Sequence, residues 1–564
     1  MAQTEPALDE VNQQNEEPFY WLNEDSRAFL DEGYLIEGVT AEERVREIAE
    51  RAEEVLDDDG FADKFYDYMS RGFYSLASPV WSNFGLDRGL PISCFGSYME
   101  DNMESILYTQ AEVGEMTKLG GGTSGYFGEI RPRGSPITNN GKSNGSYSFT
   151  ELFDTIINVV SQGETRRGQF AGYIDVEHDD LDEWLNIKTE GDPVQDIYYG
   201  VIIGDDWFRA MVNGDEEKRE TWAEIIETRI NVGVPYIIFR DNMNDGKPQV
   251  YKDRGYEINA SNLCTEIALP ATPDESFVCC LSSMNALHYD EWKDTDAVET
   301  LTRFLDAVME EFIQEAEGTQ FMERPVRFAK RHRAIGIGVL GWHSYLQSEM
   351  IPFDSMEAME KNEAIFRTIK KRSYEESRRL ADEFGEPEVL EGYGRRNATT
   401  MSVAPTKSSS VILGQVSPSI EPLKSNYFVR DGAKLKSTQK NRFLEAILKQ
   451  RGRDEREVWD SIAQNDGSVQ HLDCLTDEEK EVFKTFAEIP QMAIINQAAQ
   501  RQKHIDQAQS LNVSIDPSEV SVKEINQLYI EAWKKGVKSL YYQHSVNAAQ
   551  KFSRDILECK ACES

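Results

Sequence analysis

An amide, a thiol and a carboxylate alternate in the stretch Asn262-Leu263-Cys264-Thr265-Glu266. On an extended segment, alternating side chains point to the same face, so the three groups would meet on one side of the chain. A thiol between a hydrogen-bonding amide and a potential base indicates a site for sulfur chemistry. The spacing alone leaves a second interpretation open, in which Cys264 is a small buried hydrophobic residue and Glu266 is solvated.

The chain has seven cysteines, at positions 94, 264, 279, 280, 474, 559 and 562. An odd number, spread thinly over 564 residues, is not typical of a secreted disulfide framework, so we expect reduced or catalytic thiols. Cys559 and Cys562 stand at the C-terminus, where no core is expected. A mobile, redox-active dithiol is favoured there over half a zinc site, because zinc takes about four ligands and no second pair or nearby histidine supplies them. An incidental tail stays open as an interpretation.

Two stretches are suited to anions. The strand-like run 399–404 leads into the turn Pro405-Thr406-Lys407-Ser408-Ser409-Ser410, which places hydroxyls and one amine at the C-terminal end of a strand, where α/β folds bind ligands. The stretch 120–145 is rich in glycine and contains Arg131 and Arg133, so its backbone could approach an anion closely. Ordinary loops without a ligand remain the alternative for both.

Two nucleotide-binding patterns fail on closer inspection. Gly120-x-Gly122-x-x-Gly125 matches the dinucleotide fingerprint, but the helix-like stretch 111–118 precedes it where a strand is required. Gly141-Lys142-Ser143 resembles the end of a P-loop, yet the upstream glycine, Gly134, stands seven positions before Gly141 instead of five. The sequence therefore predicts neither a Rossmann site nor a P-loop.

The elements that must position these groups follow from periodicity. Thr40-x-x-Glu43 predicts a capping box before an amphipathic helix, in a helical N-terminal layer that ends near position 74. Apolar runs at 197–203, 234–239, 334–340, 399–404 and 537–542 read as strands, and 355–384 reads as a helix that Gly385 ends. Alternating strands and helices indicate an α/β fold with a largely parallel sheet. The adjacent Tyr541 and Tyr542 end an apolar run, a place where aromatic pairs usually belong to the core.

Charge excludes several classes of function. Lys and Arg number 60 against 100 Asp and Glu, which gives a formal net charge of −40 and argues against binding to nucleic acid or a membrane surface. No apolar run of about 18 residues could span a membrane, and the acidic start is unlike a signal peptide. We therefore expect an intracellular, cytoplasmic protein. Residues 1–17 are polar and acidic and are expected to form a disordered arm.

Seven stretches, in the same order, resemble the large catalytic subunit of class I ribonucleotide reductases, and the resemblance runs from about Trp21 to Ser564. They are Ser78-Pro79-Val80-Trp81-Ser82-Asn83, Ile92-Ser93-Cys94-Phe95, Ser261-Asn262-Leu263-Cys264-Thr265-Glu266, Cys279-Cys280-Leu281-Ser282-Ser283-Met284-Asn285, Ala404-Pro405-Thr406-Lys407-Ser408-Ser409, Leu540-Tyr541-Tyr542-Gln543 and the terminal cysteine pair. A chance match could account for one stretch but not for seven in order.

The resemblance implies a ten-stranded α/β barrel made of two antiparallel five-stranded halves, with Cys264 on a finger loop in the middle. It divides the chain into the arm 1–17, a helical region 18–77, the barrel 78–550 and a flexible redox-active tail 551–564. Only 77 residues precede Ser78. That length is too short for the family's ATP-cone as well as its helical region, so we expect no overall activity site and no shutdown by dATP through a cone.

The resemblance also implies catalytic roles. Cys264 would carry the transient thiyl radical that takes the ribose 3′ hydrogen, Glu266 would be the base on the 3′ hydroxyl, and Asn262 would orient the substrate. Cys94 and Cys279 would supply two electrons and end as a disulfide, with Cys280 as the rival of its neighbour. Two further pairs complete the scheme: the tyrosines 541 and 542 for radical transfer, and the cysteines 559 and 562 for reopening the disulfide.

Binding residues and partners are implied in the same way. Substrate contacts would come from Ser78, Ser93, Gly122, Pro405, Thr406, Lys407, Ser408 and Ser409, with the phosphates at the turn. The allosteric dNTP or ATP effector would bind at a homodimer interface through Asp101, Arg131, Gln162, Arg166 and Arg167. The chain itself would hold no cofactor or metal. A metal-containing small subunit would supply the radical, and thioredoxin or glutaredoxin would supply electrons for a ribonucleoside diphosphate substrate.

Two other functions stay open. An adenosylcobalamin-dependent reductase would share the catalytic cysteines, although it has no need of a tyrosine relay. An inactive, nucleotide-binding regulatory paralogue would share the fold, although binding alone requires none of the five cysteines in the scheme. If the chain is viral, its location would be the host cytoplasm.

Overall fold

The structure is a computed structural model that describes residues 17–163, 166–431, 436–517 and 520–545, together with Leu8 and Val11. Nearly all of the predicted arm 1–17 and the whole predicted tail 551–564, with Cys559 and Cys562, lie outside the described residues. Predictions about those segments therefore stay predictions.

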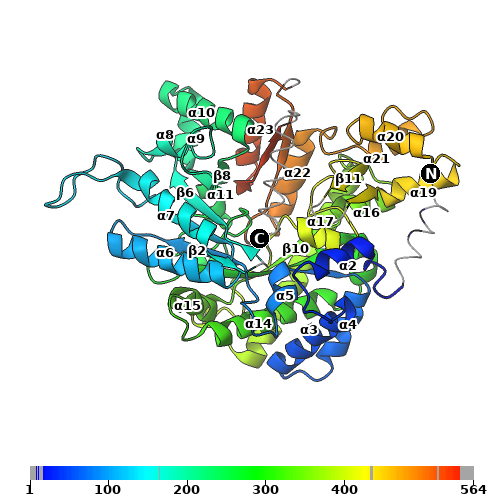
Figure 1. The fold of residues 1–564 in the computed structure, drawn as a ribbon, viewed down its shortest axis with the longest axis horizontal. Coiled ribbons are helices and arrows are strands. Elements are labelled where there is room, and N and C mark those ends of the chain that lie inside the picture. Colours follow the sequence, from blue (N-terminus) through cyan, green and yellow to red (C-terminus); the bar gives the residue numbers. More distant parts are fainter. Residues whose placement is uncertain are drawn as a thin grey trace.

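The N-terminal region is helical, as predicted. It contains α2 (Glu24–Asp31), α3 (Ala41–Leu56) and α4 (Phe61–Ser70), and α3 begins with the predicted capping box between Thr40 and Glu43. The apolar face of α3, from Val45 to Leu56, is buried. Helices α3 and α4 pack on each other and on α14 (Ala297–Ala316), so this layer covers one side of the central sheet (Figure 1).

Five parallel strands form the first half of the sheet. In order they are β2 (Cys94–Tyr98), β3 (Thr123–Tyr126), β6 (Phe170–Asp175), β7 (Tyr198–Ile203) and β8 (Tyr236–Phe239). Their connections include α6 (Met103–Lys118), α7 (Gly145–Val159), α8 (Leu181–Trp184), α9 (Asp205–Asn213) and α10 (Glu216–Val232). Strands β3, β7 and β8 are buried along their whole length, which is typical of parallel strands covered on both faces.

The second half runs the other way. Strand β9 (Phe277–Asn285) pairs in parallel with β10 (Ile335–Leu340), and parallel bridges Ile337–Met401 and Val403–Gln509 extend the pairing to the segments at 401–403 and 507–511. The fifth strand of this half is formed by β14 (Ser539–Leu540) and β15 (Gln543–Ser545). Strand β15 pairs in parallel with β13 (Val513–Ile515), which follows the segment 507–511 in the sequence. The predicted strand 399–404 is therefore present as a bridged segment of this half.

Two antiparallel seams join the halves. Strand β2 pairs with β9 at one seam, and β14 pairs with β8 at the other. The pairings return to their starting strand, so the sheet is closed, and the predicted ten-stranded barrel of two antiparallel five-stranded halves is confirmed. Strand β1 (Tyr74–Leu76) pairs antiparallel with the later part of β9, beyond the residues that pair with β2.

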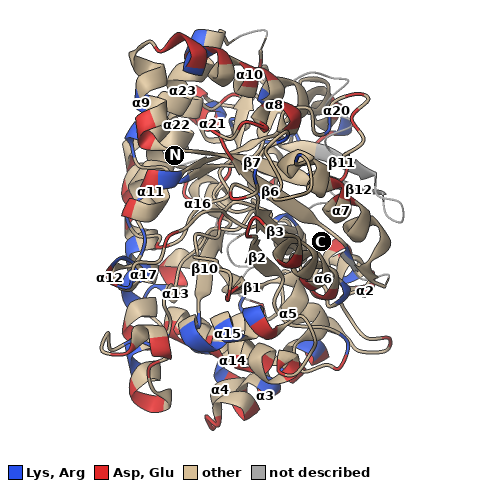
Figure 2. Cartoon of the chain, turned by 90° about the vertical axis from the view of Figure 1, so that its left-hand side faces the viewer, with Lys and Arg blue, Asp and Glu red and all other residues tan. Residues whose placement is uncertain are grey.

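Helices surround this sheet, and Figure 2 shows that they carry most of the visible charged residues, with both signs interspersed. The predicted helix 355–384 is α17 (Met356–Phe384), with Ser355 as N-cap and Gly385 as C-cap. The other long helices are α15 (Glu323–His332), α19 (Arg442–Gln450), α20 (Arg456–Gln464), α22 (Gln491–Gln502) and α23 (Val522–Lys534). In the part of the chain that the structure describes, no helix is both long and apolar enough to cross a membrane.

Short elements complete the described chain. They are α5 (Ser78–Asn83), α11 (Arg240–Asp245), α12 (Gln249–Asp253), α13 (Tyr289–Trp292), α16 (Trp342–Ser348), α18 (Lys407–Ile412), α21 (Asp477–Val482), the 3-10 turns Ala286–His288 and Glu388–Leu390, and the strands β4 (Ser161–Gln162), β5 (Arg166–Arg167), β11 (Tyr427–Asp431) and β12 (Lys436–Lys440). The long irregular segment between α12 and β9 contains positions 262–266.

Candidate active site

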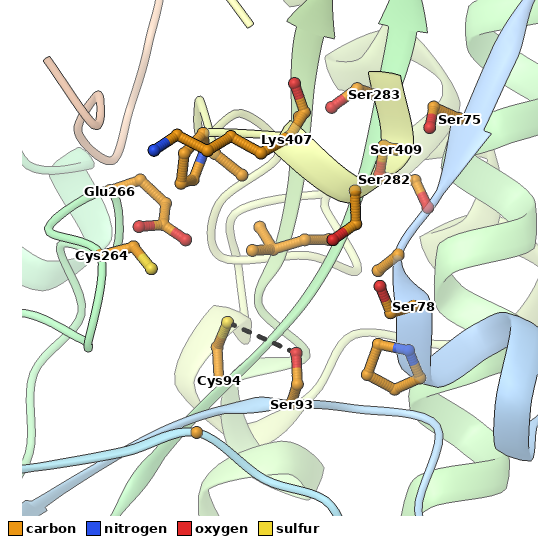
Figure 3. Close-up of a pocket in the computed structure, with 18 of the residues that line it drawn as sticks. Ser75, Ser78, Ser93, Cys94, Cys264, Glu266, Ser282, Ser283, Lys407 and Ser409 are labelled. Carbon is orange, nitrogen blue, oxygen red and sulfur yellow. Dashed lines mark hydrogen bonds between the residues drawn. The ribbon is translucent and has the colours of Figure 1, made fainter. Parts of the chain in front are cut away.

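One pocket collects residues from six distant parts of the chain. Its lining comprises Ser75, Ala77, Ser78, Pro79, Ser93, Cys94, Gly122, Asn262, Leu263, Cys264, Glu266, Leu281, Ser282, Ser283 and the turn from Ala404 to Ser409. Figure 3 shows Cys264 and Glu266 on one side, Ser78 on the opposite side, and Cys94 with Ser93 near the strand between them. All three predicted catalytic residues of the 262–266 stretch, and all eight predicted substrate residues, thus line the same pocket.

Three backbone carbonyl groups of the 262–266 loop accept hydrogen bonds from side chains of the barrel, and these bonds hold the loop inside it. Tyr173 Oη donates to the Asn262 carbonyl at 2.5 Å, Ser510 Oγ to the Cys264 carbonyl at 2.5 Å, and Ser539 Oγ to the Thr265 carbonyl at 3.0 Å. Buried backbone groups require partners, and here strands on opposite sides of the barrel provide them. The loop therefore has a fixed position despite its lack of regular structure.

The three functional groups come together through a turn and not through the predicted extended segment. The segment is not extended: Thr265 has a φ of 68°, in the left-handed region, and a turn occupies positions 263–265. The turn, rather than strand alternation, brings Asn262, Cys264 and Glu266 to the pocket. Asn262 Oδ1 closes the loop by accepting a hydrogen bond from the Ile267 amide at 3.2 Å.

Glu266 is a buried acid with an altered proton affinity. Only 2% of its surface is exposed, and burial raises its pKa to about 7, while hydrogen bonds to the carboxylate oppose that rise. Ser510 Oγ donates to Glu266 Oε2 at 3.0 Å. A carboxyl group with a pKa near neutrality can accept and return a proton at physiological pH, which is what a general base requires.

Cys94 and Cys279 face each other across the seam between the two halves. They are direct partners in the antiparallel pairing of β2 with β9. Directly opposed residues have Cα atoms about 4.5–5.5 Å apart, within the range that a disulfide spans. Cys280 is the next residue on β9, so its side chain points to the other face of the sheet. Both β9 thiols are buried, and burial raises the pKa of each.

The turn at 405–409 closes another side of the pocket. Thr406 has a φ of 50° and is the N-cap of α18, so the turn presents backbone amides, the Lys407 side chain and two serines to the cavity. Thr406 Oγ1 accepts a hydrogen bond from the Ser419 amide at 2.7 Å. Amides at the start of a helix, next to an amine, suit an anionic group.

Tyr541 and Tyr542 are buried, and their rings contact each other at a tilt of 49°. Their ring centroids are 4.1 Å apart, and their exposed fractions are 0% and 6%. A third ring, Tyr236, lies 4.8 Å from Tyr541 and 5.3 Å from Tyr542, and its hydroxyl is 3.1 Å from that of Tyr542. Tyr541 and Tyr542 thus belong to the core, and together with Tyr236 they form a cluster of three aromatic rings in mutual contact.

The predicted effector residues fall on two loops beside α6. Asp101 and Arg131 form an ion pair of 2.7 Å, and Asp101 directly precedes the N-cap of α6. Gln162 lies in the β4–β5 hairpin, which also packs against α6, and its Nε2 donates to Asn83 Oδ1 at 3.1 Å. Arg167 is exposed, and the side chain of Arg166 lies outside the described residues.

Several residues of the site were missed from the sequence. Ser510 and Gln507 contact the loop and Cys279, Tyr236 contacts the tyrosine pair, and further serines, Ser75, Ser282 and Ser283, line the pocket. Single serines, glutamines and tyrosines within apolar runs carry no distinguishing pattern. Only the closed sheet brings these strands to the loop.

A closed α/β barrel with a cysteine on a central loop defines a narrow class of proteins. The family model "Ribonucleotide reductase, barrel domain" matches residues 92–218, 215–392 and 387–543, and the chain belongs to this family. The solved structure of the Actinobacillus ureae class Id ribonucleotide reductase alpha subunit is similar, with a TM-score of 0.90 and 58% identity over 96% of this chain and 99% of that one.

Two viral relatives are similar along most of their length. The putative ribonucleoside-diphosphate reductase large subunit of Frog virus 3 is 38% identical over 532 residues, which are 89% of this chain and 92% of the relative. The ribonucleoside-diphosphate reductase large subunit of Invertebrate iridescent virus 3 is 32% identical over 566 residues, covering 87% and 88%. The predicted resemblance to this family is confirmed.

Proposed function

We propose that this chain is the catalytic large subunit of a class I ribonucleotide reductase, which reduces ribonucleoside diphosphates to deoxyribonucleoside diphosphates for DNA synthesis. The observation that carries the proposal is the convergence of Cys264, Glu266, Asn262 and Cys94 on one pocket, with Cys279 opposite Cys94. In the net reaction, the ribose 2′ C–O bond breaks, a C–H bond forms, two thiols become a disulfide and one water leaves.

Each catalytic group has a chemical task. The Cys264 sulfur, oxidised by one electron to a thiyl radical, takes the 3′ hydrogen of the ribose, because S–H and C–H bonds have comparable strength. Glu266 accepts the proton of the 3′ hydroxyl, and Asn262 donates a hydrogen bond to the sugar. The pKa of Glu266, raised by burial to about 7, supports its role as the base.

The electrons for reduction come from Cys94 and Cys279. Their direct pairing across β2 and β9 supports Cys279 over Cys280 as the partner. We propose that Cys559 and Cys562 then reopen the disulfide by thiol exchange, and that thioredoxin or glutaredoxin reduces this tail in turn, because a tethered thiol has a high effective concentration. This chemistry requires a reducing compartment, so we place the enzyme in the cytoplasm.

The substrate binds between the turn and the α5 loop. The amides and Lys407 of the turn 405–409 hold the diphosphate, while Ser78, Ser93 and the open backbone of Gly122 contact the sugar. A Cβ on Gly122 would lie 3.3 Å from a Leu263 methyl group, so a side chain there would narrow the pocket. This arrangement supports a nucleotide with its phosphates at the positive end of α18.

The radical comes from outside the chain. A class I alpha subunit works with a separate metal-containing small subunit, and the close contact between the rings of Tyr541 and Tyr542 supports transfer of the oxidising equivalent from that partner to Cys264. Tyr236 contacts both rings, with its centroid 4.8 Å from that of Tyr541 and 5.3 Å from that of Tyr542. An adenosylcobalamin-dependent enzyme would generate its radical in the pocket and would need no such contact.

Regulation is proposed at a homodimer interface over α6 and α7. Met103 and Leu107 on α6 are 51% and 48% exposed, and Val159 at the end of α7 is 78% exposed. This apolar surface lies beside the Asp101–Arg131 pair and the β4–β5 hairpin, where we place the dNTP or ATP effector. Gln162 contacts Asn83 at the end of α5, whose first residue, Ser78, lines the pocket. That contact supports a link between effector and substrate.

The decisive assay is incubation with each ribonucleoside diphosphate, a dithiol reductant, an effector and the small subunit, scored for the deoxynucleotide. Cys264→Ser should abolish the product, whereas Cys280→Ser, a matched change on the other face of β9, should retain most of it. Full activity of Cys264→Ser would refute the proposal. Activity of this chain with adenosylcobalamin alone would favour the cobalamin alternative, and nucleotide binding without turnover would favour a regulatory paralogue.

A further inference from the structure

Gln507 is fully buried, and both its backbone and its side-chain amide are held by hydrogen bonds. Its backbone N–H donates to the Met401 carbonyl at 3.1 Å, and its backbone carbonyl accepts from Lys538 Nζ at 2.7 Å. Its side-chain Oε1 accepts from the Ala268 amide at 3.3 Å, and its Nε2 donates to the Ile335 carbonyl at 3.1 Å. The side chain thus spans from the finger loop to the second half of the barrel.

These partners determine which way the amide faces. The Ala268 amide can only donate and the Ile335 carbonyl can only accept, so the oxygen must face the loop and the nitrogen must face β10. In this orientation Nε2 lies 3.3 Å from Cys279 Sγ and 3.0 Å from Thr399 Oγ1, so its two hydrogens are shared among the Ile335 carbonyl, the Thr399 hydroxyl and the Cys279 sulfur. A preorganised N–H dipole therefore points at one sulfur of the dithiol in a site without water-exposed surface, where such a dipole acts strongly.

The two sulfurs of the pair are not equivalent. Cys94 is partly exposed and lines the pocket, whereas Cys279 is 1% exposed and does not line it. Cys94 Sγ lies 3.8 Å from both Ser93 Oγ and Asn262 Nδ2, whereas Cys279 Sγ lies 3.3 Å from Gln507 Nε2. Access favours Cys94 as the attacked sulfur. Burial raises the pKa of Cys279 and opposes charge on its sulfur, and the hydrogen bond from Gln507 lowers that pKa in turn, so this contact favours Cys279 as the sulfur that receives charge.

We propose that Gln507 is a positioning residue that makes Cys279 the leaving sulfur when the Cys94–Cys279 disulfide is reduced, so that the incoming thiol attacks Cys94. The inference rests on the proposed function, which supplies the disulfide. A thiolate attacks Cys94 Sγ, a mixed disulfide forms there, the Cys94–Cys279 bond breaks, and its electron pair goes to Cys279 Sγ. A second thiol of the dithiol reductant then releases Cys94 and leaves as a disulfide.

The first test locates the attack and needs no variant of this residue. The full-length chain is oxidised with diamide, treated briefly with limiting glutathione, quenched with N-ethylmaleimide and mapped by peptide mass spectrometry. We expect the mixed disulfide, with glutathione or with a tail cysteine, on Cys94 and the maleimide on Cys279. The reverse labelling would overturn the inference.

The second test measures the rate at which dithiothreitol reduces this disulfide. We expect Gln507→Met to reduce it about tenfold more slowly, which is the effect of losing a hydrogen bond to a charged sulfur. Gln507→Glu, which keeps the shape but places an acceptor at Nε2, should be slower still, whereas a purely structural role predicts that this isosteric change is the milder one. Wild-type rates in both variants would refute the inference.

Gln509→Met is the matched control. Gln509 is also buried and lies two residues further along the same segment, but it bonds Arg501, the Ala498 carbonyl and Gln502 instead of a thiol. Its variant should reduce at the wild-type rate, and an equal slowing there would assign the effect to packing and overturn the inference. These reduction rates are measured without turnover, so they are independent of the deoxynucleotide assay. If no Cys94–Cys279 disulfide accumulates during turnover, that result contradicts the proposed function and not the role of Gln507.

Discussion

The proton affinity of Glu266 should set the acidic limb of the activity profile. With a pKa of about 7, the carboxylate fraction rises about tenfold between pH 6 and pH 8, and the rate of a step that needs the base should rise with it. An unperturbed glutamate, with a pKa near 4.3, would be ionised throughout this range and would give a flat profile. The measurement is kcat/KM for a ribonucleoside diphosphate against pH, with saturating small subunit.

Ser510→Ala tests the physical cause of this limb. Ser510 Oγ shares its one proton between the Cys264 carbonyl, at 2.5 Å, and Glu266 Oε2, at 3.0 Å, and the second contact stabilises the charged form of the carboxylate. Its loss should raise the pKa of Glu266 further and move the acidic limb upward by about one pH unit, since a hydrogen bond to a charged group contributes about 1.5–3 kcal/mol and one pKa unit corresponds to about 1.4 kcal/mol. At pH 6.5 the variant should be several-fold slower, whereas at pH 9 most of the rate should return.

Ser402→Ala is the matched control for that shift. Ser402 Oγ also bonds Glu266, but at its backbone carbonyl, at 2.8 Å, so the variant loses a loop contact without touching the carboxylate. Its limb should stay where the wild-type limb is. A flat wild-type profile between pH 6 and pH 8, or an equal displacement in both variants, would refute the assignment of the limb to a hydrogen-bonded Glu266. Infrared titration of the Glu266 carboxyl, identified by its loss in Glu266→Gln, gives the same pKa without turnover.

Three further predictions address stability, radical transfer and assembly. Burial raises the folded-state pKa of Glu266 from 4.5 to about 7, so the contribution of this group to the free energy of unfolding is fully present below pH 4.5 and falls by up to about 3 kcal/mol as the pH rises through 7. Glu266→Gln should remove this loss and therefore raise the urea midpoint at pH 8 but not at pH 4.5. Tyr541→Phe should abolish deoxynucleotide formation while leaving the melting temperature within a few degrees of wild type, and full activity would exclude the tyrosine relay. Leu107→Glu should make the effector-bound chain monomeric in sedimentation velocity, whereas Met356→Glu, at a more exposed apolar position on α17, should leave a dimer. A dimeric Leu107→Glu would place the interface elsewhere.

Local chemistry explains why many elements could be predicted from the sequence. The capping box at Thr40 is present as predicted, because it depends on two residues three positions apart. The helix that ends at Gly385 likewise depends on one residue with a φ of 84°. The helix before Gly120 is α6, so the rejection of a dinucleotide fingerprint there was correct. The barrel itself was predicted only from the resemblance of seven ordered motifs to a known family. Pairing between strands that are distant in the sequence leaves no local signal.

The errors and omissions have a common physical origin. The stretch 262–266 alternates like a strand, but strand alternation requires neighbours to pair with, and here the carbonyl groups bond to side chains from Tyr173, Ser510 and Ser539 instead. Those partners are 89, 246 and 274 residues away from the carbonyls they contact, beyond the reach of any periodicity. The choice between Cys279 and Cys280 was open for the same reason, because only the register of β9 against β2 decides which thiol faces Cys94.

The antiparallel seams explain why this chemistry needs two half-barrels. In a parallel sheet, crossover helices separate neighbouring strands in sequence, and all strand ends of one kind gather at one edge. Reversal of one half brings the start of β2 against the first part of β9, so that a thiol pair is held at the wall of the pocket by the backbone pairing itself. The loop that carries Cys264 is attached separately, mainly by the second half. The proposed radical sulfur of Cys264 and the proposed reducing thiols of Cys94 and Cys279 are therefore held by different sets of contacts, and Gln507 joins the two sets through the Ala268 amide and Cys279 Sγ.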